Sequence, residues 1–533
     1  MNVAFDRWIP VVTLTGESKL ASLKEVFTEG DKLADLAVRP HERVALMRLF
    51  MCVAHATLNG PKDYDEWCRV PGRLPNETEE YLMNQKNSFE LFDKKKPWLQ
   101  LSELTDDKKG LNTSEDSVLN WSKVSKMDFA FATGANSTLF DHQGLLDERD
   151  YPLHQVIVSM LTFQCFSVGG LMGQIFWNGL LCGELANHRK EKGPIKSSDG
   201  PCVPSSMIHA FLRGHNLAST IQLNIPTYED VRFCYNNQEI GKPVWELMPS
   251  SLSDSEAIVN ATSTYVGRLV PLTRFIRLNS SGSKMLLGNG LTYPFFSNGF
   301  PPEPSATVTI KSDKRVLLAY RPSKAIWREL SAILVKRKSD NTGGPLTLQA
   351  MQDSNGCDLI IAALARDKAT IVDTIESIYH IPKKLITTEG NIAYESEVKK
   401  ADFFANRLAW AVETYRKEID GGWEGRLKSA GPKSGKLKAM LHSSATNYYW
   451  TTVEKNLSYL FNHIESIGTE EALPTRKIWR NILFSATCEA YRIACGQETP
   501  RQIKAFSIGW SRLVTKSTES DPETEETKEE DEE

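Results

Sequence analysis

The side chains that could do chemistry are present in this sequence, but they do not stand at the spacings that catalysis or metal binding requires. The ten histidines are scattered singly, and none belongs to an HExxH or HxH pattern that would direct two imidazoles at one metal ion. There is no GxxxxGK[ST] stretch to hold a triphosphate and no GxSxG stretch to present a serine nucleophile. Asp141 and His142 form the nearest thing to a reactive pair, but adjacent residues of an extended chain point to opposite sides. We therefore predict a non-catalytic protein, with an enzyme site assembled from distant residues as the open alternative.

The nine cysteines predict neither disulfides nor a metal site. Their number is odd and they are widely spaced, and no CxxC pair stands at the spacing of a zinc site. We expect buried, reduced cysteines, no zinc and no other cofactor. The opening MNVAFDRWIPVV lacks the basic and apolar regions of a secretory signal, and no apolar run reaches the ~18–20 residues that span a bilayer. These features predict a cytoplasmic protein without membrane contact.

The net charge of −4 conceals a strongly acidic end. Residues 517–533 hold ten acids and one lysine, a local charge of −9, so the rest of the chain carries +5. A run of like charge without apolar residues cannot bury surface, which predicts a disordered acidic tail over residues 516–533. The modestly basic remainder is compatible with a nucleic-acid partner but does not require one.

Length and pattern predict two folded domains before this tail. At 533 residues the chain exceeds what one hydrophobic core organises. Residues 1–375 alternate short β-type runs with helices, as a large, irregular α/β domain would. Within them, residues 40–58 repeat apolar side chains at three- and four-residue spacing after a first-turn proline, which predicts a helix with one buried face. Residues 306–320 place two apolar runs around the polar turn KSDK, which predicts a hairpin.

Long amphipathic segments dominate residues 380–515. Apolar stripes at helical spacing run through three long segments, the second of which begins after Pro432. A shorter helix at Ile371–Tyr379 or at Ala505–Leu513 would complete a four-helix bundle. The predicted fold class is therefore mixed α+β, in which the irregular N-terminal α/β domain is followed by a C-terminal four-helix bundle.

Six short patterns follow one another along the chain in an order that resembles a known family. They are an aromatic-Ile-Pro start, an F…D…PWLQ segment, a Gly-Ala loop, an Arg-Gly…Ser-Thr…Leu-Asn run, an Asn-Gly…Pro…Pro turn and an Arg…Ala-Thr-Ile stretch, at residues 5–11, 89–101, 127–144, 213–226, 297–310 and 365–373. No single pattern is specific. Six in order, followed by a predicted bundle, resemble the large subunit of the type I-E Cascade complex, the CasA family.

The resemblance implies a subunit that reads DNA inside a complex whose guide RNA recognises the target sequence. Base pairing reads the target, while the protein reads a short flanking motif (the PAM) and opens the duplex beside it. The family reads this motif mainly from the minor groove, whose pattern of donors and acceptors is degenerate. The implied partners are double-stranded target DNA, the guide-RNA ribonucleoprotein with the other Cascade subunits, and a nuclease-helicase effector that acts in antiviral defence.

Two elements of the family fall on short segments of this chain. Its glycine loop is similar to SVGGLMG at residues 167–173, where Gly169 and Gly170 lack a Cβ and would let nucleic acid approach the backbone closely. Its wedge, a hairpin tip inserted at the first target base pair, is similar to the stretch Arg366, Asp367, Lys368 and Ala369. Tight-turn glycines and a solvated charged turn would produce the same sequences, and both alternatives stay open.

A third element is the family's first DNA-contacting loop. It falls on residues 135–143, with Asn136, Phe140 and His142 as the candidate contacts, although Phe140 could equally be a buried anchor. The chain also departs from the family in two respects: it lacks the paired CxxC motifs of some relatives, and it lacks an expected lysine. A lysine is expected a few residues before Asn298, but the stretch reads GNGLTYPFFSNG, and the nearest lysine, Lys284, stands too early.

Basic segments predict a nonspecific grip on DNA phosphates, although each could be an ordinary solvated face. The selected cations lie in polar loops or at the start of a bundle helix: Arg189, Lys190, Lys192, Lys196, Lys336, Arg337, Lys338, Lys433 and Lys436. Neutralising phosphates releases counterions, so the affinity would fall with salt. The main alternative function is a purely structural docking scaffold in a multi-subunit complex, with the bundle as its docking face.

Overall fold

The computed structural model describes residues 1–107, 120–130, 151–186, 193–235, 240–348, 357–368, 370–419 and 432–514. The chain divides into two compact units, residues 1–381 and residues 382–533. This division falls later than the expected domain end at residue 375, because strand β17 (Thr370–Ile381) runs through that position and pairs with a strand of the first unit.

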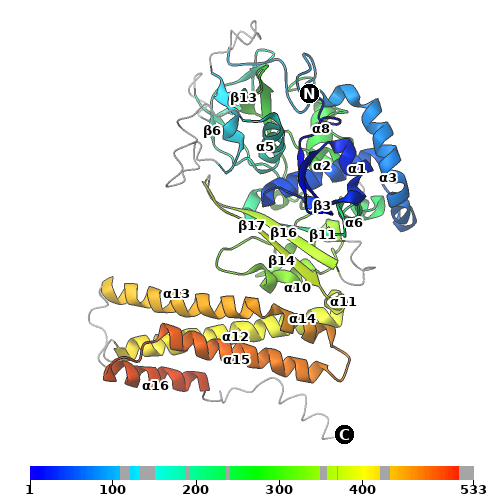
Figure 1. Ribbon diagram of the computed structural model, residues 1–533. Helices are drawn as coiled ribbons and strands as arrows, with labels where there is room; N and C mark the ends of the chain where they lie inside the picture. The colour runs from blue at the N-terminus through cyan, green and yellow to red at the C-terminus, as the bar shows by residue number, and fades with distance from the viewer. Residues whose placement is uncertain are drawn as a thin grey trace. The chain divides into compact units, whose positions relative to one another are not determined.

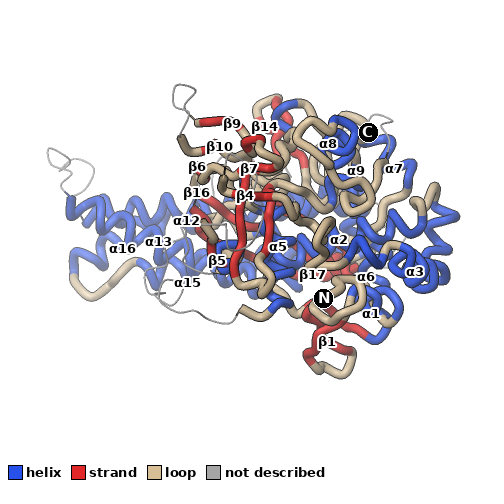
Figure 2. Tube along the Cα trace, turned by 90° about the horizontal axis from the view of Figure 1, so that it is seen from above, coloured by secondary structure: helices blue, strands red, loops and turns tan. Residues whose placement is uncertain are grey.

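The first unit combines helices with many short strands. Its helices are α1 (Leu23–Thr28), α2 (Pro40–Leu58), α3 (Tyr64–Asn84), α5 (Leu153–Phe166), α6 (Leu217–Leu223), α7 (Tyr228–Cys234), α8 (Ser255–Ser263), α9 (Tyr265–Leu269) and α10 (Leu330–Ile333). Long loops connect the short strands, as Figure 2 shows. The irregular α/β character predicted for this part of the chain is confirmed.

The strands pair in small antiparallel sheets. They are β1 (Ile9–Thr13), β2 (Ser18–Ala21), β3 (Leu33–Leu36), β4 (Leu104–Thr105), β5 (Ser122–Lys123), β6 (Leu171–Met172), β7 (Phe176–Trp177), β8 (Leu180–Leu181), β9 (Glu184–Leu185), β10 (Ile195–Lys196), β11 (Ile208–Arg213), β12 (Arg274–Leu278), β13 (Lys284–Asn289), β14 (Val308–Lys311), β15 (Lys314–Leu317), β16 (Cys357–Asp367) and β17. The sheet orders are β2-β1-β3, β6-β10-β9, β11-β16-β17, β12-β13-β5, β4-β7-β8 and the pair β14-β15. The last pair is the hairpin predicted within residues 306–320.

Helix α2 lies at the centre of the first unit. It begins at Pro40 and ends at Leu58, as the sequence predicts, but it is buried around its whole circumference from His41 to His55 rather than on one face. The reason is that its apolar residues occupy every side, and a helix of this kind packs inside a core.

The sheet β11-β16-β17 packs against α2, and Figure 1 shows the three strands side by side beneath this helix. Strand β16 is the middle strand and is buried from Leu359 to Ala365, whereas β17 forms an exposed edge. Arg43 of α2 donates to Glu376 of β17 at 2.6 Å. Residues 371–379, one of two candidates for the fourth bundle helix, therefore form a strand, because antiparallel pairing across a short turn outweighs their helical spacing.

A buried carboxylate joins α2, α9 and the segment that contains residue 303. Glu303 accepts from Arg48 at 2.7 Å and from Arg268 at 2.5 Å. Burial alone would raise the pKa of Glu303, but the two guanidiniums lower it, so the carboxylate stays charged. Arg48 also donates to the carbonyl of Leu269 at 3.0 Å, which fixes the end of α9. Removing this carboxylate would leave two buried guanidiniums without a counterion.

The second unit is the predicted four-helix bundle, with one short helix before its first long helix and another after its second. Its helices are α11 (Lys383–Ile386), α12 (Thr388–Ile419), α13 (Pro432–Lys455), α14 (Leu457–Glu465), α15 (Ala472–Ala494) and α16 (Pro500–Val514). Figure 1 shows α12, α13 and α15 side by side, and α16, the other candidate for the fourth helix, packs on α12. The segment after Pro432 breaks at Asn456 instead of continuing as one helix.

Polar contacts fix the order of the bundle helices. Glu397 of α12 is 1% exposed and accepts from Arg476 and Arg480 of α15 at 2.9 and 3.1 Å. Tyr449 of α13 donates from its hydroxyl to the carbonyl of Ala401 at 2.8 Å. These contacts join α12 to two of its neighbours at specific positions, which apolar packing alone would not specify.

Replacing Glu303 with glutamine should lower the free energy of unfolding by about 3–5 kcal/mol, because it leaves two buried guanidiniums without their charged partner. Urea denaturation followed by tryptophan fluorescence measures this change. The control is Glu329→Gln, whose ion pair with Lys324 is partly exposed and should contribute less than about 1 kcal/mol. Equal losses in the two variants would contradict the importance of the buried carboxylate.

Candidate nucleic-acid interface

The predicted glycine loop, residues 167–173, follows the end of α5 and includes the short strand β6. The N–H of Ser167 donates to the carbonyl of Phe163 at 2.9 Å and ends the helix. Ser197 then holds the loop, since its N–H donates to the carbonyl of Gly170 at 2.9 Å and its hydroxyl lies 3.0 Å from both the nitrogen and the carbonyl oxygen of Gly170. The backbone of the loop is therefore anchored on both sides of the Gly170 peptide.

Backbone hydrogen bonds join the segment around Ser197 to the end of α5. The N–H of Gly200 donates to the carbonyl of Ser167 at 2.7 Å, and the N–H of Cys202 donates to the carbonyl of Cys165 at 3.0 Å. A Cβ at Gly200 would lie 2.4 Å from the carbonyl oxygen of Cys165, so a glycine is required for this close packing.

A buried arginine supports the loop from the interior. Arg274 is 2% exposed and donates to the carbonyl of Val168 at 3.0 Å and to the hydroxyl of Ser197 at 3.3 Å. Burial lowers the pKa of Arg274 to about 10, and nearby Asp199 opposes this decrease, so the guanidinium remains charged at neutral pH. Its charge adds to the positive potential at the loop.

Gly169 and Gly170 lack a side chain for different reasons. A Cβ at Gly169 would lie 2.7 Å from the carbonyl oxygen of Ser197, so packing requires a glycine there. A Cβ at Gly170 would have no described atom within 4 Å, and the Gly170 backbone does not adopt the left-handed conformation that favours glycine. Gly170 is also exposed. Nothing in the described chain requires a glycine at position 170. Close approach of an external backbone or base to this residue would require one.

The predicted wedge is the tip of the β16–β17 hairpin. Asp367 pairs with Thr370, so the connection between the strands is two residues long, and its first residue, Lys368, has the positive φ of 54° that such short connections need. The side chains of Asp367 and Lys368 are exposed, and nothing further is described of Ala369. The register shifts just before Arg366, a bulge that re-aims the side chains at the tip.

One carboxylate connects the glycine loop to this hairpin. Asp199 accepts from the N–H of Gly169 at 2.7 Å, and its two oxygens accept from the two terminal nitrogens of Arg366 at 2.8 and 2.6 Å. The backbone N–H of Arg366 donates to the hydroxyl of Ser206 at 3.0 Å. Arg366 is therefore ion-paired within the protein, while Asp367 and Lys368 are the exposed residues of the tip.

A basic hollow of about 370 Å³ lies along the β14–β15 hairpin. It is lined by Phe296, Ser297, Gly299, Phe300, Lys314, Arg315 and Asn341, and none of these is acidic. The guanidinium of Arg315 donates to the carbonyl of Asp340 at 2.6 Å and remains exposed. Cations and aromatic rings around one hollow suit the phosphates and bases of nucleic acid.

A second hollow, of about 190 Å³, adjoins the basic hollow. It shares Phe296, Ser297 and Arg315 with the basic hollow and reaches Ser205, the neighbour of the Ser206 that anchors Arg366. Ser206 therefore joins the hairpin strand to the segment that borders this second hollow.

The basic hollow lies close to the segment in which the family's lysine is expected. Ser297 directly precedes Asn298, and the resemblance places a lysine a few residues before Asn298. Lys284 lies instead at the start of β13, opposite Lys123 of β5. Lys314 and Arg315 line the same hollow as Ser297 and bring positive charge to it from the neighbouring hairpin.

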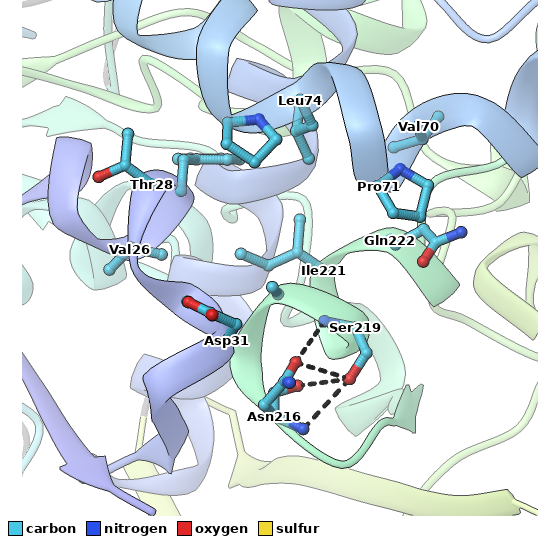
Figure 3. A pocket seen from close by; sticks show the side chains of 14 residues that line it. Val26, Thr28, Asp31, Val70, Pro71, Leu74, Asn216, Ser219, Ile221 and Gln222 are labelled. Atoms are coloured by element: carbon cyan, nitrogen blue, oxygen red, sulfur yellow. Dashed lines mark hydrogen bonds between the residues drawn. The ribbon is translucent and has the colours of Figure 1, made fainter.

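A hollow of about 400 Å³ between α1, α3 and α6 has different chemistry. Figure 3 shows apolar side chains such as Val26, Leu74 and Ile221 around it, together with the carboxylate of Asp31. No lysine or arginine lines it. It therefore does not suit a polyanion, and the basic hollow is the better candidate for contact with nucleic acid.

The lysines and arginines predicted to contact DNA phosphates differ in their exposure to solvent. Lys196, Lys336 and Lys338 are exposed, and Lys196 lies opposite Leu171 of the glycine loop in the β10–β6 pairing. Arg337 is wrong as a DNA contact, because it is 4% exposed and donates to the carbonyls of Gly344 and Ala306 inside the fold.

Several predicted contacts lie where the structure gives no description. The candidates outside the described residues are Asn136, Phe140, His142, Arg189, Lys190 and Lys192. Lys433 and Lys436 lie in α13, but their side chains are not described. All of these assignments stay predictions.

Sequence reasoning missed Asp199, Lys314 and Arg315. A signal for the last two is present, since residues 311–338 hold nine basic residues and two acidic ones while residues 1–381 as a whole carry −2. Asp199 gives no such signal, because its partners stand 30 and 167 residues away.

The described residues contain no cluster of three His, Cys, Asp or Glu side chains with the geometry of a metal site. None of the described helices combines the length and the apolar character needed to cross a bilayer. All nine cysteines are free, and all except Cys68 are buried.

Solved structures of CRISPR-associated proteins share this fold. CasA of Thermus thermophilus matches with a TM-score of 0.73 at 21% identity, over 96% of this chain and 98% of that one. Cse1 of Acidimicrobium ferrooxidans matches with a TM-score of 0.72 at 17% identity, over 96% of both chains. A chain of a CRISPR RNA-guided surveillance complex matches with a TM-score of 0.70 at 16% identity, over 97% of this chain and 99% of that one. The fold is therefore that of the large CRISPR-associated proteins of the CasA/Cse1 class.

Sequence comparison gives the family. The CasA/Cse1 protein of Thermus thermophilus is 24% identical over 513 residues, which cover 92% of this chain and 91% of that protein. The model of the family described as CRISPR-associated protein Cse1 matches residues 2–490. The chain belongs to this family, the large subunits of type I-E Cascade, as its sequence patterns predict.

The two loop glycines should respond differently to substitution. Gly169→Ala should lower the free energy of unfolding by about 1–3 kcal/mol, because the added Cβ meets the Ser197 carbonyl. Gly170→Ala should change it by less than about 0.5 kcal/mol, because its Cβ enters open space. Urea denaturation of both variants measures the difference, and an equal loss at Gly170 would show that the folded chain itself requires that glycine.

Proposed function

We propose that this chain recognises the flanking motif of target duplex DNA and begins strand opening within an RNA-guided CRISPR surveillance complex. The glycine loop contacts the motif, the hairpin tip enters the duplex at the first target base pair, and the basic hollow holds a phosphate backbone. Guide RNA recognises the target by base pairing. The chain contributes binding and positioning, and a separate nuclease-helicase effector cuts the DNA.

The observation that carries this proposal is the exposed, open side of Gly170. Its missing side chain has no explanation inside the described fold, and it lies in a loop whose backbone is fixed by Ser197 and supported by the charged guanidinium of Arg274. A fixed backbone without a Cβ can approach a base edge closely and lose little entropy on binding.

The hairpin tip supports the strand-opening part of the proposal. Lys368 stands in a tight two-residue turn at the end of long, paired strands, with exposed polar and charged side chains at its apex. Unstacking a base step costs a few kcal/mol, so an inserted element must be rigid and must offer new contacts to the separated bases. A hairpin that continues a buried central strand meets the first requirement.

The basic hollow supports the contact with phosphate. Lys314 and Arg315 neutralise backbone charge at a position that no described acidic side chain lines, and this contact carries no sequence information by itself. The proposed division of work therefore separates the motif-reading loop from a positioning surface.

We also propose that the bundle docks to other subunits. The competing hypothesis is that docking is the only role of the chain. Ile392, Phe403 and Trp410 of α12 are 62, 42 and 51% exposed, and they recur on one side of that helix. Such a face fits other subunits or the effector. If the chain were only a scaffold, the assembled complex would bind target DNA equally well when the glycine loop and the basic hollow are both altered.

Gly170→Val should abolish discrimination between permitted and forbidden flanking motifs in the assembled complex, because a branched side chain fills the space needed for close approach. Binding of a duplex library with varied flanking motifs, by complexes carrying guide RNA, measures this loss. The unfolding of the variant should match that of the unaltered chain. Discrimination that survives in Gly170→Val would remove the loop from the motif-reading site.

The double variant Lys314→Gln with Arg315→Gln should weaken DNA binding for all motifs alike. Loss of two phosphate contacts should lower the slope of log affinity against log salt by about 1.8. The matched control is Lys32→Gln with Lys62→Gln, two cations that are 69 and 72% exposed and lie away from the hollow. The slope should not change in the control, and a changed motif ranking in the first variant would mean that the hollow reads bases.

A further inference from the structure

Asp199 occupies the point where three otherwise separate parts of the first unit meet. It lies on the segment between β10 and Cys202 that is joined to the end of α5. Its carboxylate accepts the N–H of Gly169 from the glycine loop and both terminal nitrogens of Arg366 from the hairpin. A two-pronged guanidinium–carboxylate pair fixes direction as well as distance. The Asp199 and Arg366 side chains are 23 and 19% exposed, so solvent screens the pair only partly.

The loop side of this arrangement is rigid. Ser197 is bonded to Gly170, Gly200 to Ser167, and Asp199 itself to Gly169, so the loop and the segment that contains Asp199 move as one body. A displacement of the loop backbone by bound DNA is therefore transmitted to the Asp199 carboxylate.

The hairpin is placed so that a displacement of the Asp199 carboxylate would change the direction of its tip. Arg366 stands at the bulge, two residues before the turn residue Lys368, and its backbone N–H is held by Ser206. A bulge is a local weak point in a strand ladder, since one residue there lacks its regular partner. The side-chain bond to Asp199 therefore sets the direction in which the tip beyond the bulge points.

We propose that Asp199 is a positioning residue that couples reading of the flanking motif to strand opening, through its simultaneous bonds to the Gly169 N–H and the Arg366 guanidinium. Contact of DNA with the loop holds Asp199 in place, and Asp199 in turn holds the hairpin tip in the direction that enters the duplex. This inference rests on the proposed function of the loop and the tip. It adds a residue that touches no DNA and a reason why the two elements act together.

The variants Asp199→Asn and Arg366→Gln test this coupling in the assembled complex with guide RNA. The asparagine oxygen can still accept the Gly169 N–H, but it cannot form the charged pair with Arg366. Arg366→Gln removes the same pair and leaves the loop bond of Asp199 in place. The matched control is Asp358→Asn, which removes a carboxylate paired with Arg213 at 3.5 Å near the opposite end of the same strand.

Two quantities are measured on duplexes with permitted and forbidden motifs: affinity for unopened DNA, and the opening rate reported by a fluorescent base at the first target pair. Each of the two variants should lower the opening rate on permitted motifs about tenfold while affinity changes less than about twofold, within the range of coupling between linked sites. The double variant should be no worse than either single variant, because both remove one interaction. Asp358→Asn should match the unaltered complex.

Additive losses in the double variant, or opening rates that keep their motif dependence in Asp199→Asn, would overturn the coupling. Failure of the proposed function gives a different result. If Gly170→Val leaves motif discrimination intact, the reading site itself is misplaced. If Gly170→Val abolishes discrimination while Asp199→Asn opens DNA normally, the loop reads the motif and only the coupling is wrong.

Discussion

The close contact between the end of α5 and residues 197–202 is the constraint on which the candidate interface depends. Two backbone hydrogen bonds join these segments, and Gly200 allows an approach that any Cβ would block. The loop that follows α5 starts from this contact. Backbone hydrogen bonds therefore fix the direction of the loop without any contribution from side chains. Asp199 and Ser197 reach the loop from one strand-like segment for the same reason. The hairpin is placed against that segment, so its position also follows from this packing.

The deeper core specifies the arrangement of the elements around this region. Glu303 lies between two guanidiniums in the interior, and α2 is surrounded by protein on every side. A buried charge of this kind contributes specificity of arrangement more than net stability, because its desolvation offsets much of the attraction. In this chain it specifies how α2, α9 and the segment before β14 fit together. The smaller hollow reaches that segment, since Glu303 lines it, and it shares Phe296, Ser297 and Arg315 with the basic hollow.

Local periodicity accounts for what the sequence predicts well. The helix at Pro40–Leu58, the hairpin β14–β15 and the four long helices of the bundle all follow from spacing within short windows. Residues 371–379 show where this reasoning fails, because a strand partner outside the window decided their structure. The candidate site divides in the same way. The glycine loop and the hairpin tip are visible as motifs, whereas the Asp199–Arg366 pair and the burial of Arg337 depend on tertiary contacts that no local pattern carries.

The distribution of charge in the first unit has a kinetic consequence. Residues 1–381 carry 41 basic and 43 acidic side chains, yet nine of those basic residues fall within residues 311–338. Charges that nearly cancel in total give little net attraction to DNA, whereas a local excess of lysine and arginine attracts a polyanion at short range. Such a local excess raises the fraction of collisions with a polyanion that begin at this part of the chain. For the DNA-reading role proposed above, this uneven placement of lysine and arginine would favour encounters at the β14–β15 hairpin without making the chain adhere to every duplex that it meets.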